Sequence, residues 1–467
     1  MSHRDTDRRT ASNVSAQDLS RVLDALWPRE ESDRVSFAVR PDCRWTARGL
    51  VLAALLWTWS TKGTLGERLA QALGVLRTLA AGCAPERVSY QAFIKLLERR
   101  TETLATSLKT AFRERMRECG DALVAGYAVF AIDGTKLSLP RTRSNEDRFA
   151  PAKTRGGRKK RGGKRPRSKA ARARRAARKK ADCPQASLTL AFHAGLRLPW
   201  AWRCGASDVG EREQARALFD ELPDEALIAA DCGFHGYEFW SDLIDSGRSF
   251  VIRVGGNVRL LRKLGRMRGG RDLVHVWPRK IAARGLPPLA LRLLTVHDGR
   301  RAWHLATNVL DSASLSDADV AEIYRRRWGV EVYFRHFKRT FGRAKLRSRK
   351  AEHSACEAEW SLLGLWAMLL YARRERDLAD VTRRISPTRV LRAFGRAIDE
   401  PTRLAPPGET LVDALRAATA DGYARRDKRS RGYPRKKYES RTKPPIVRLA
   451  TVAERRLARL IALRTAA

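Results

Sequence analysis

The amino-acid sequence predicts a mixed α/β protein, in which one sheet is flanked by helices and both ends of the chain are helical. Apolar residues follow helical spacing within residues 14–120. Short apolar runs then alternate with helical segments across residues 127–254, an order typical of a mixed sheet. A long helix with a capping-box-like start at Ser316 follows, and an apolar helix is expected at 360–372.

The N-terminal region is the first predicted unit. Its helical spacing is clearest at Leu19, Val22, Leu23 and Leu26. Pro41 marks a connection between helices. We therefore expect an N-terminal helical domain over residues 1–120.

The sheet should begin with the apolar run 127–132, which stops at Asp133 and Gly134. Alternation of apolar runs and breakers predicts further strands at 187–192, 198–203, 226–230 and 249–254, and helices at 211–221 and 238–245. Residues 256–311 are rich in valine, leucine and glycine, and we expect them to form a β-rich insertion.

The charge of the chain indicates a polyanionic partner. It has 94 Lys and Arg against 51 Asp and Glu, a net charge of +43. Such a charge repels itself unless phosphates neutralise it, whereas a small acidic substrate would not require it. No apolar run reaches the roughly 20 residues that span a bilayer, and the start of the chain lacks an apolar signal core. The seven cysteines are scattered without zinc-like spacing, so we expect reduced thiols. We expect a cytoplasmic protein that does not associate with a membrane.

Basic residues concentrate in a low-complexity segment at 153–180, which contains 16 Lys or Arg and no acidic residue. We expect this segment to become ordered on a polyanion and to follow DNA phosphates, although a solvated loop is the alternative. The residues assigned to this contact are Lys159, Lys160, Arg161, Arg174 and Arg175.

Three acidic residues are candidates for chemistry. Asp133 and Asp231 each follow a predicted strand, and Glu331 lies within the long helix. Acids at strand ends can meet at one rim of a sheet, where a crossing helix adds a third carboxylate. Converging carboxylates suit Mg²⁺, and two such ions can act on the attacking and leaving oxygens of a phosphoryl transfer. Taken singly, each Asp-containing turn is more often only a turn, and Glu331 could be a surface acid.

The helix around Glu331 favours the functional interpretation. Its buried face is predicted to carry apolar residues, namely Ile323, Val330, Phe334, Phe337 and Phe341. A narrow stripe beside that face holds Tyr324, Arg327, Glu331 and Lys338, with Trp328 and Arg335 at its flanks. A solvated salt-bridge edge would not explain the aromatic residues, whereas a phosphodiester backbone and a stacked base would.

The spacing Tyr324-x2-Arg327-x3-Glu331-x6-Lys338 resembles the YREK signature of bacterial insertion-sequence DDE transposases, insertion-sequence family four. Two further segments, AIDGT at 131–135 and AADCGFHGY at 229–237, resemble the first and second Asp motifs of that group. The resemblance covers roughly residues 120 to 350. It implies an RNase H-like catalytic domain that transposes DNA with divalent metal.

The resemblance also implies roles for individual residues. Asp133, Asp231 and Glu331 match the catalytic, metal-binding triad, and Mg²⁺ or Mn²⁺ would bind as two ions. The residues that match DNA contacts are Tyr324, Arg327, Trp328, Arg335, Lys338 and Trp303. Trp303 matches a residue that stacks on a flipped base, although a lone Trp on a strand is more often a core residue.

Two features depart from the family pattern. Cys232 stands where the second motif often has Arg, which keeps the metal ligand but removes a cation; we expect a buried structural thiol there. The basic segment 153–180 has no counterpart in the family pattern.

The expected organisation is an N-terminal DNA-end-binding domain, a catalytic core in two parts, and a C-terminal region for dimerisation and DNA contact. The ranges after the N-terminal domain are 121–255, the insertion 256–311, 312–372 and 373–467. The expected function is cleavage at terminal inverted repeats, through a hairpin intermediate, and strand transfer into target DNA by a homodimer associated with the bacterial nucleoid. A catalytically inactive, transposase-derived DNA-binding protein is the main alternative, and an RNA-binding protein is a third.

Overall fold

The computed structural model describes residues 13–37, 43–79, 85, 87–120, 122–149, 184–264, 273–298, 301–375, 384–406, 408–420 and 443–466. Among these residues, no helix combines the length and the apolar character that crossing a membrane requires. The five cysteines within these ranges are free thiols. The predicted basic segment 153–180 lies outside the described residues.

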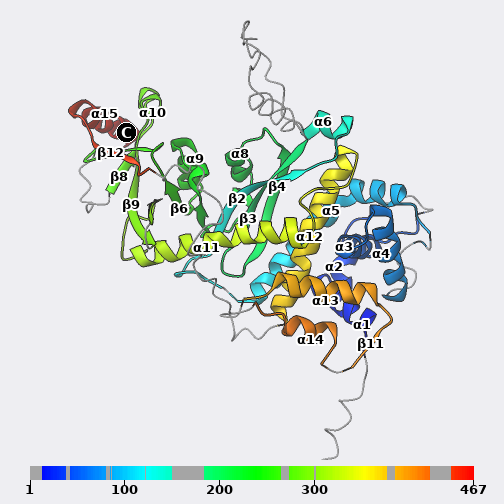
Figure 1. The fold of residues 1–467 in the computed structure, drawn as a ribbon. Coiled ribbons are helices and arrows are strands. Elements are labelled where there is room, and N and C mark those ends of the chain that lie inside the picture. Colours follow the sequence, from blue (N-terminus) through cyan, green and yellow to red (C-terminus); the bar gives the residue numbers. More distant parts are fainter. Residues whose placement is uncertain are drawn as a thin grey trace, which may run out of the picture.

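One large mixed sheet runs through the molecule (Figure 1). Its strands follow one another in the order β12-β7-β8-β9-β10-β6-β5-β2-β3-β4. Their bounds are β2 Val129–Ser138, β3 Gln185–His193, β4 Leu198–Ala206, β5 Leu227–Ala230, β6 Ser249–Val254, β7 Arg259–Arg262, β8 Leu273–Val276, β9 Leu289–Asp298, β10 Arg301–Thr307 and β12 Ile446–Leu449. Helices flank this sheet, which confirms the predicted fold class.

The strands that carry the two aspartates are neighbours in the sheet. β2 pairs in parallel with β5, and β5 pairs in parallel with β6. β3 is antiparallel to both β2 and β4. The short apolar runs form these strands because they are buried on both faces, as expected for a sheet covered by helices.

The prediction that the first strand ends at Asp133 is wrong. β2 continues to Ser138, and Asp133 lies opposite Leu190 of β3. Asp-Gly is usually a turn signal, but the antiparallel partner β3 gives hydrogen bonds to the backbone on both sides of the aspartate. Asp231 does follow the last residue of β5, as predicted.

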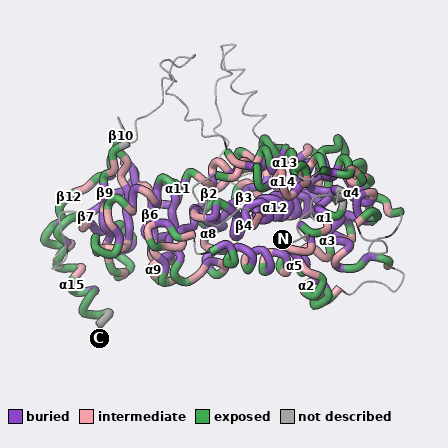
Figure 2. Tube along the Cα trace, turned by 90° about the horizontal axis from the view of Figure 1, so that it is seen from below, coloured by how far each residue is buried: buried purple, intermediate pink, exposed green. Residues whose placement is uncertain are grey.

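The N-terminal helices pack as a bundle around a central apolar pair of helices. Their bounds are α1 Ser15–Leu26, α2 Arg29–Asp33, α3 Ala47–Trp59, α4 Leu65–Leu79 and α5 Tyr90–Glu118. α12, Ala351–Arg374, packs against α3 and α5, and Trp59 Nε1 donates a 2.8 Å hydrogen bond to Gly364 O. α3 and α12 are buried almost all round, which is why their sequences are apolar without a clear stripe (Figure 2).

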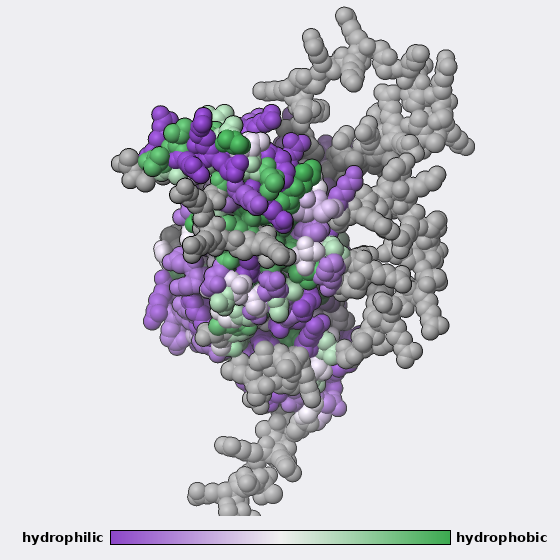
Figure 3. Space-filling view, turned by 90° about the vertical axis from the view of Figure 1, so that its left-hand side faces the viewer, coloured by the Kyte–Doolittle hydropathy of each residue, from purple (hydrophilic) through white to green (hydrophobic). Residues whose placement is uncertain are grey.

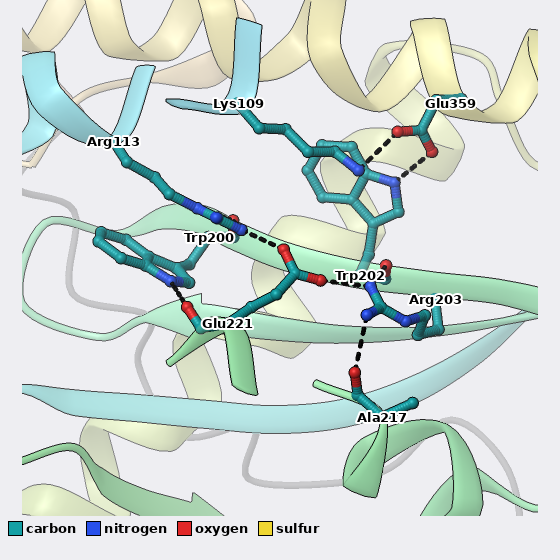
Figure 4. Close-up of polar contacts among 8 residues, drawn as sticks. All are labelled: Lys109, Arg113, Trp200, Trp202, Arg203, Ala217, Glu221 and Glu359. Carbon is teal, nitrogen blue, oxygen red and sulfur yellow. Dashed lines mark hydrogen bonds and ion pairs between the residues drawn. The ribbon is translucent and has the colours of Figure 1, made fainter. Parts of the chain in front are cut away.

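Side chains join this bundle to the edge strand β4 (Figure 4). Lys109 of α5 pairs with Glu359 of α12 at 2.7 Å, and Trp202 Nε1 donates to the same carboxylate at 2.6 Å. Glu221 accepts from Arg113 of α5 and from Arg203 of β4. The edge of the sheet is therefore covered by helices and held by paired charges, which protects it from pairing with another strand.

The remaining helices lie along the sheet and at the C-terminal end. Their bounds are α6 Arg143–Phe149, α8 Glu211–Arg216, α9 Tyr237–Asp245, α10 Arg279–Ala283, α11 Asp317–Arg335, α13 Pro387–Asp399, α14 Leu411–Arg416 and α15 Val452–Ala466. Short 3-10 helices cover Phe219–Glu221 and Cys232–Phe234. The two-residue strands β1, Asn13–Val14, and β11, Leu404–Ala405, pair with each other.

The region predicted as a β-rich insertion contains β7, β8, β9 and β10, and these strands continue the main sheet beyond β6. β12, from the C-terminal part of the chain, adds to its far edge in parallel with β7. The predicted domain boundaries stay a prediction.

α11 is the long predicted helix. Ser316 caps it with a full capping box together with Asp319. After Arg335 the helix continues as one π-helical turn, His336–Thr340. All five residues predicted for its apolar face are buried, namely Ile323, Val330, Phe334, Phe337 and Phe341.

Candidate active site

Asp133 lies in the middle of β2 on the side of the sheet that α11 crosses. Gly134 N donates a 2.9 Å hydrogen bond to Asp133 Oδ1. Burial raises the pKa of the Asp133 carboxyl to about 7, and the negative charges of Asp231 and Glu331 act in the same direction, while Arg327 opposes them. Asp133 therefore lies close enough to both Asp231 and Glu331 to interact with them through charge.

Asp231 reaches this place because β5 lies beside β2. Ala230 of β5 is paired with Ile132 of β2, so Asp231 follows at the level of Asp133. The 3-10 helix that begins at Cys232 is capped by Asp231, whose Oδ1 accepts from Gly233 N at 2.7 Å. Cys232 itself is half-buried, less enclosed than the buried thiol expected there.

Glu331 is presented by α11 and is held by a residue of its own helix. Arg327 Nη2 donates to Glu331 Oε1 at 2.6 Å. The two residues are one helical turn apart, the spacing at which side chains on a helix meet. Arg327 is only 7% exposed, and within the described chain its Nε and Nη1 have no hydrogen-bond partner.

Tyr324 and Trp303 form an aromatic pair behind this arginine. Their rings meet edge to face, 5.5 Å apart, and the Arg327 guanidinium lies 5.3 Å from the centre of the Tyr324 ring. Burial raises the pKa of the Tyr324 hydroxyl, which is also hydrogen-bonded with Arg253. The structure thus brings Trp303 of β10 next to the α11 stripe, where it is half-buried.

Of the other predicted residues, one contacts the sheet and two are exposed to solvent. Lys338, in the π-helical turn, donates to Thr135 Oγ1 of β2, two residues after Asp133. Trp328 is 56% exposed and Arg335 is exposed, so both side chains are open to a partner. The other assigned basic residues lie outside the described residues, namely Lys159, Lys160, Arg161, Arg174 and Arg175.

The donor chemistry of the site fits a divalent cation. Its acids supply carboxylate oxygens, which Mg²⁺ prefers, and their mutual repulsion at Asp133 is what a cation would relieve. In the described part of the chain, no three His, Cys, Asp or Glu side chains are arranged to hold an ion by themselves. Mg²⁺ usually completes such a shell with water and substrate phosphate, so Asp133, Asp231 and Glu331 would supply only part of it.

Sequence patterns did not identify two contacts at the site. Arg253 of β6 forms a hydrogen bond with the Tyr324 hydroxyl, and the Thr135 hydroxyl accepts a hydrogen bond from Lys338. Thr135 could have been found, because it stands in the AIDGT segment two residues from Asp133. Arg253 gave no signal, since its contact depends on how β6 and α11 pack.

A comparison with protein families matches residues 125–367, more than half of the chain, to the family described as Transposase DDE domain. The chain belongs to this DDE transposase family. The matched range contains Asp133, Asp231 and Glu331 together with the strands and the helix that present them.

One curated relative is the transposase InsG for insertion sequence element IS4 of Escherichia coli (strain K12). The identity is 27% over 254 residues, which are 52% of this chain and 50% of the relative. The chain thus spans about half the length of this curated relative. Among solved structures, a piggyBac transposase synaptic complex with hairpin DNA overlaps with a TM-score of 0.39 and 10% identity, covering 89% of this chain and 87% of that one.

Proposed function

We propose that the protein is an active transposase, which cleaves DNA at the ends of a mobile element and joins those ends to target DNA. The observation that carries the proposal is that Asp133 interacts through charge with Asp231, Glu331 and a buried arginine, within a DDE transposase domain. We further assign the chain to the YREK group, because Tyr324, Arg327, Glu331 and Lys338 keep that spacing on α11 and its π-helical turn.

Asp133, Asp231 and Glu331 would bind two Mg²⁺ or Mn²⁺ ions. Such ions, when bound, polarise the attacking and leaving oxygens of an in-line phosphoryl displacement. The first displacement uses water and frees a 3′-hydroxyl, and the second uses that hydroxyl on the opposite strand to form a hairpin. In the third displacement a second water opens the hairpin and frees the 3′-hydroxyl again, which then attacks target DNA.

The protein side chains orient the DNA. The two unpartnered nitrogens of Arg327 can donate to a phosphate beside the scissile bond, and Lys338 adds a second positive charge from the same helix. Trp328 is exposed and can stack on an unpaired base at the cleaved end, while Trp303 can stack only where its half-buried ring is open. The net charge of +43 favours DNA as the polyanion, including the terminal repeats and the target.

A homodimer would bring two ends together. α15 supports this proposal because its outer face carries exposed apolar side chains, namely Val452, Leu457, Leu460 and Leu463. Figure 3 views the molecule from the side of α15, where apolar patches lie among hydrophilic ones. Exposed apolar surface of this kind is typical of protein–protein contacts.

The proposal is tested with the full-length protein, Mg²⁺ or Mn²⁺, and a labelled duplex that carries the inverted repeat flanking the gene. We expect strand cleavage by the wild type and its loss in Asp231→Ala and Glu331→Ala, with DNA binding retained. DNA binding without cleavage by the wild type would instead favour the inactive, transposase-derived DNA-binding protein.

A further inference from the structure

The side chain of His235 closes the turn that follows Asp231. This turn is the 3-10 helix Cys232–Phe234, which Asp231 caps by accepting a hydrogen bond from Gly233 N. His235 Nδ1 lies 2.6 Å from Cys232 O, within the same turn. A carbonyl oxygen can only accept a hydrogen bond, so Nδ1 carries the ring proton and donates it. The half-buried imidazole therefore fixes the residue next to Asp231.

The other ring nitrogen of His235 connects this turn to a second turn of the sheet. With the proton on Nδ1, the Nε2 atom of the neutral ring is an acceptor. Asn257 Nδ2 lies 3.0 Å from Nε2 and donates to it. Asn257 belongs to the turn between β6 and β7, which is closed by a 2.9 Å hydrogen bond from Val258 N to Gly255 O. One imidazole thus joins the turn after β5 to the turn after β6.

The turn between β6 and β7 is itself supported by the C-terminal part of the chain. A methyl group placed on Gly256 would lie 2.9 Å from Lys443 Cβ, so the two segments are in close contact there. Ile446 N donates to Val258 O at 2.9 Å, beside the parallel pairing of β12 with β7. The turn that contacts His235 is therefore held by a strand as well as by its own hydrogen bond.

Other contacts hold the far end of the turn after Asp231. Phe234 is fully buried, and its carbonyl oxygen accepts a 3.2 Å hydrogen bond from Trp240 Nε1. Arg212 Nη1 donates to His235 O at 2.8 Å. These contacts fix the backbone after the turn, whereas the imidazole of His235 reaches back to Cys232. The ring is thus the side chain that connects the anchored end of the turn to the residue beside Asp231.

We propose that His235 is a positioning residue for the carboxylate of Asp231. The inference rests on the proposed function, in which that carboxylate binds a divalent cation. A metal ligand must be held close to its productive geometry by the residues around it. His235 does this by joining Cys232 to Asn257, while Gly233 N holds one carboxylate oxygen of Asp231. Replacing such supporting residues typically lowers metal affinity or activity about 10- to 100-fold.

The test compares His235→Ala and Asn257→Ala with the control His297→Ala, all in the full-length protein. Asn257 and His297 are exposed, so replacing either side chain should leave the melting temperature unchanged. Calorimetric titration with Mn²⁺ alone measures the affinity, and the Mn²⁺ concentration for half-maximal cleavage of a labelled end is the second readout. Nitrogen NMR of the His235 ring, assigned by its absence from His235→Ala, shows which ring nitrogen carries the proton.

We expect the ring proton on Nδ1, and we expect His235→Ala to weaken Mn²⁺ binding about 10-fold and to raise the metal requirement of cleavage by a similar factor. Asn257→Ala should act in the same direction by a smaller factor. The double variant should bind Mn²⁺ no more weakly than His235→Ala, because Asn257 acts through the ring. His235→Asn, whose amide keeps a donor near the position of Nδ1, should recover part of the affinity, and His297→Ala should match the wild type.

A ring proton on Nε2, or equal Mn²⁺ affinity in the wild type and His235→Ala, would overturn the inference. If His235→Ala melts well below the wild type, Asn257→Ala decides, and an unchanged Mn²⁺ affinity in that variant would overturn the inference as well. If Asp231→Asn still abolished cleavage in either case, the proposed function would stand. A wild type that binds Mn²⁺ but never cleaves DNA contradicts the proposed function alone.

Discussion

Arg327 donates a 2.6 Å hydrogen bond to Glu331 one turn further along α11, while its guanidinium lies over the ring of Tyr324. Arg327 therefore contacts both Tyr324 and Glu331, so three of the four residues of the stripe are linked by contacts along one helix. The remaining member, Lys338, contacts β2 instead. The spacing of the stripe thus has a physical cause in helix geometry and in the position of the first aspartate.

Removing the charge of Arg327 should impair cleavage more than folding. Arg327→Gln leaves Glu331 without its cation and removes the buried donors proposed for phosphate, so we expect cleavage to fall about 100-fold. Arg325→Gln is the control, because Arg325 makes only an exposed pair with Glu322 and should change stability by less than about 1 kcal/mol. Single-turnover cleavage of a labelled end measures the cleavage rates of both variants. Equal rates in the two variants would refute the role of Arg327.

The close packing of α11 on the sheet depends on Gly329. A methyl group there would lie 2.9 Å from Phe192 Cε1, so in Gly329→Ala either the Phe192 ring or the helix must shift. We expect a loss of about 1–3 kcal/mol in the free energy of unfolding and a larger loss of cleavage, because Glu331 is two residues away. Adding Phe192→Leu should restore much of the stability and much of the cleavage. Denaturant unfolding of the single and double variants gives the coupling, and strictly additive effects would argue against this contact.

The two tryptophans should respond differently to truncation. Trp328→Ala should change the free energy of unfolding by no more than about 0.5 kcal/mol, because the side chain is exposed, yet weaken processing of DNA ends. Trp303→Ala removes a ring that packs on Tyr324 and should lower stability as well. Thermal melting combined with an assay of hairpin formation separates the two effects. A strongly destabilised Trp328→Ala protein would contradict the assignment of that side chain to DNA.

His193 should make stability depend on pH. Burial lowers the pKa of its ring to about 4, and Leu196 N donates to Nδ1, so the neutral ring is the folded form. The unfolded chain binds a proton from about pH 6.5 downward, so this part of the stability is complete above pH 6.5 and is lost as pH falls toward 4. The loss should reach about 3 kcal/mol. His193→Asn cannot take up that proton. The free energy of unfolding of this variant should therefore differ less from that of the wild type at pH 4 than at pH 7.5. A constant difference would show that the ring does not titrate.

Patterns along the chain identified the parts of the site that local geometry determines. The apolar face of α11, its cap at Ser316 and the strand before Asp231 are all as predicted, since each depends on a few neighbouring residues. The continuation of β2 past Asp133 was missed because it depends on pairing with β3, which lies more than 40 residues away.

Arg253 shows the same limit within the site. It reaches the Tyr324 hydroxyl from β6, whose sequence carries no signal for this contact, because packing between distant segments places it there. The motif identified the family, whereas the contact between Arg253 and Tyr324 became visible only in the packing of β6 against α11.

The most direct test of the central claim replaces a proposed metal ligand by a thiol. Thiolates bind Mg²⁺ poorly but accept softer ions such as Mn²⁺ far better. Cleavage of a labelled transposon end by Asp231→Cys should therefore be lost in Mg²⁺ and partly restored in Mn²⁺. The control Glu213→Cys, at an exposed position of α8, should cleave in both. Cleavage by Asp231→Cys at the wild-type rate in Mg²⁺ would contradict a metal-binding role for this carboxylate.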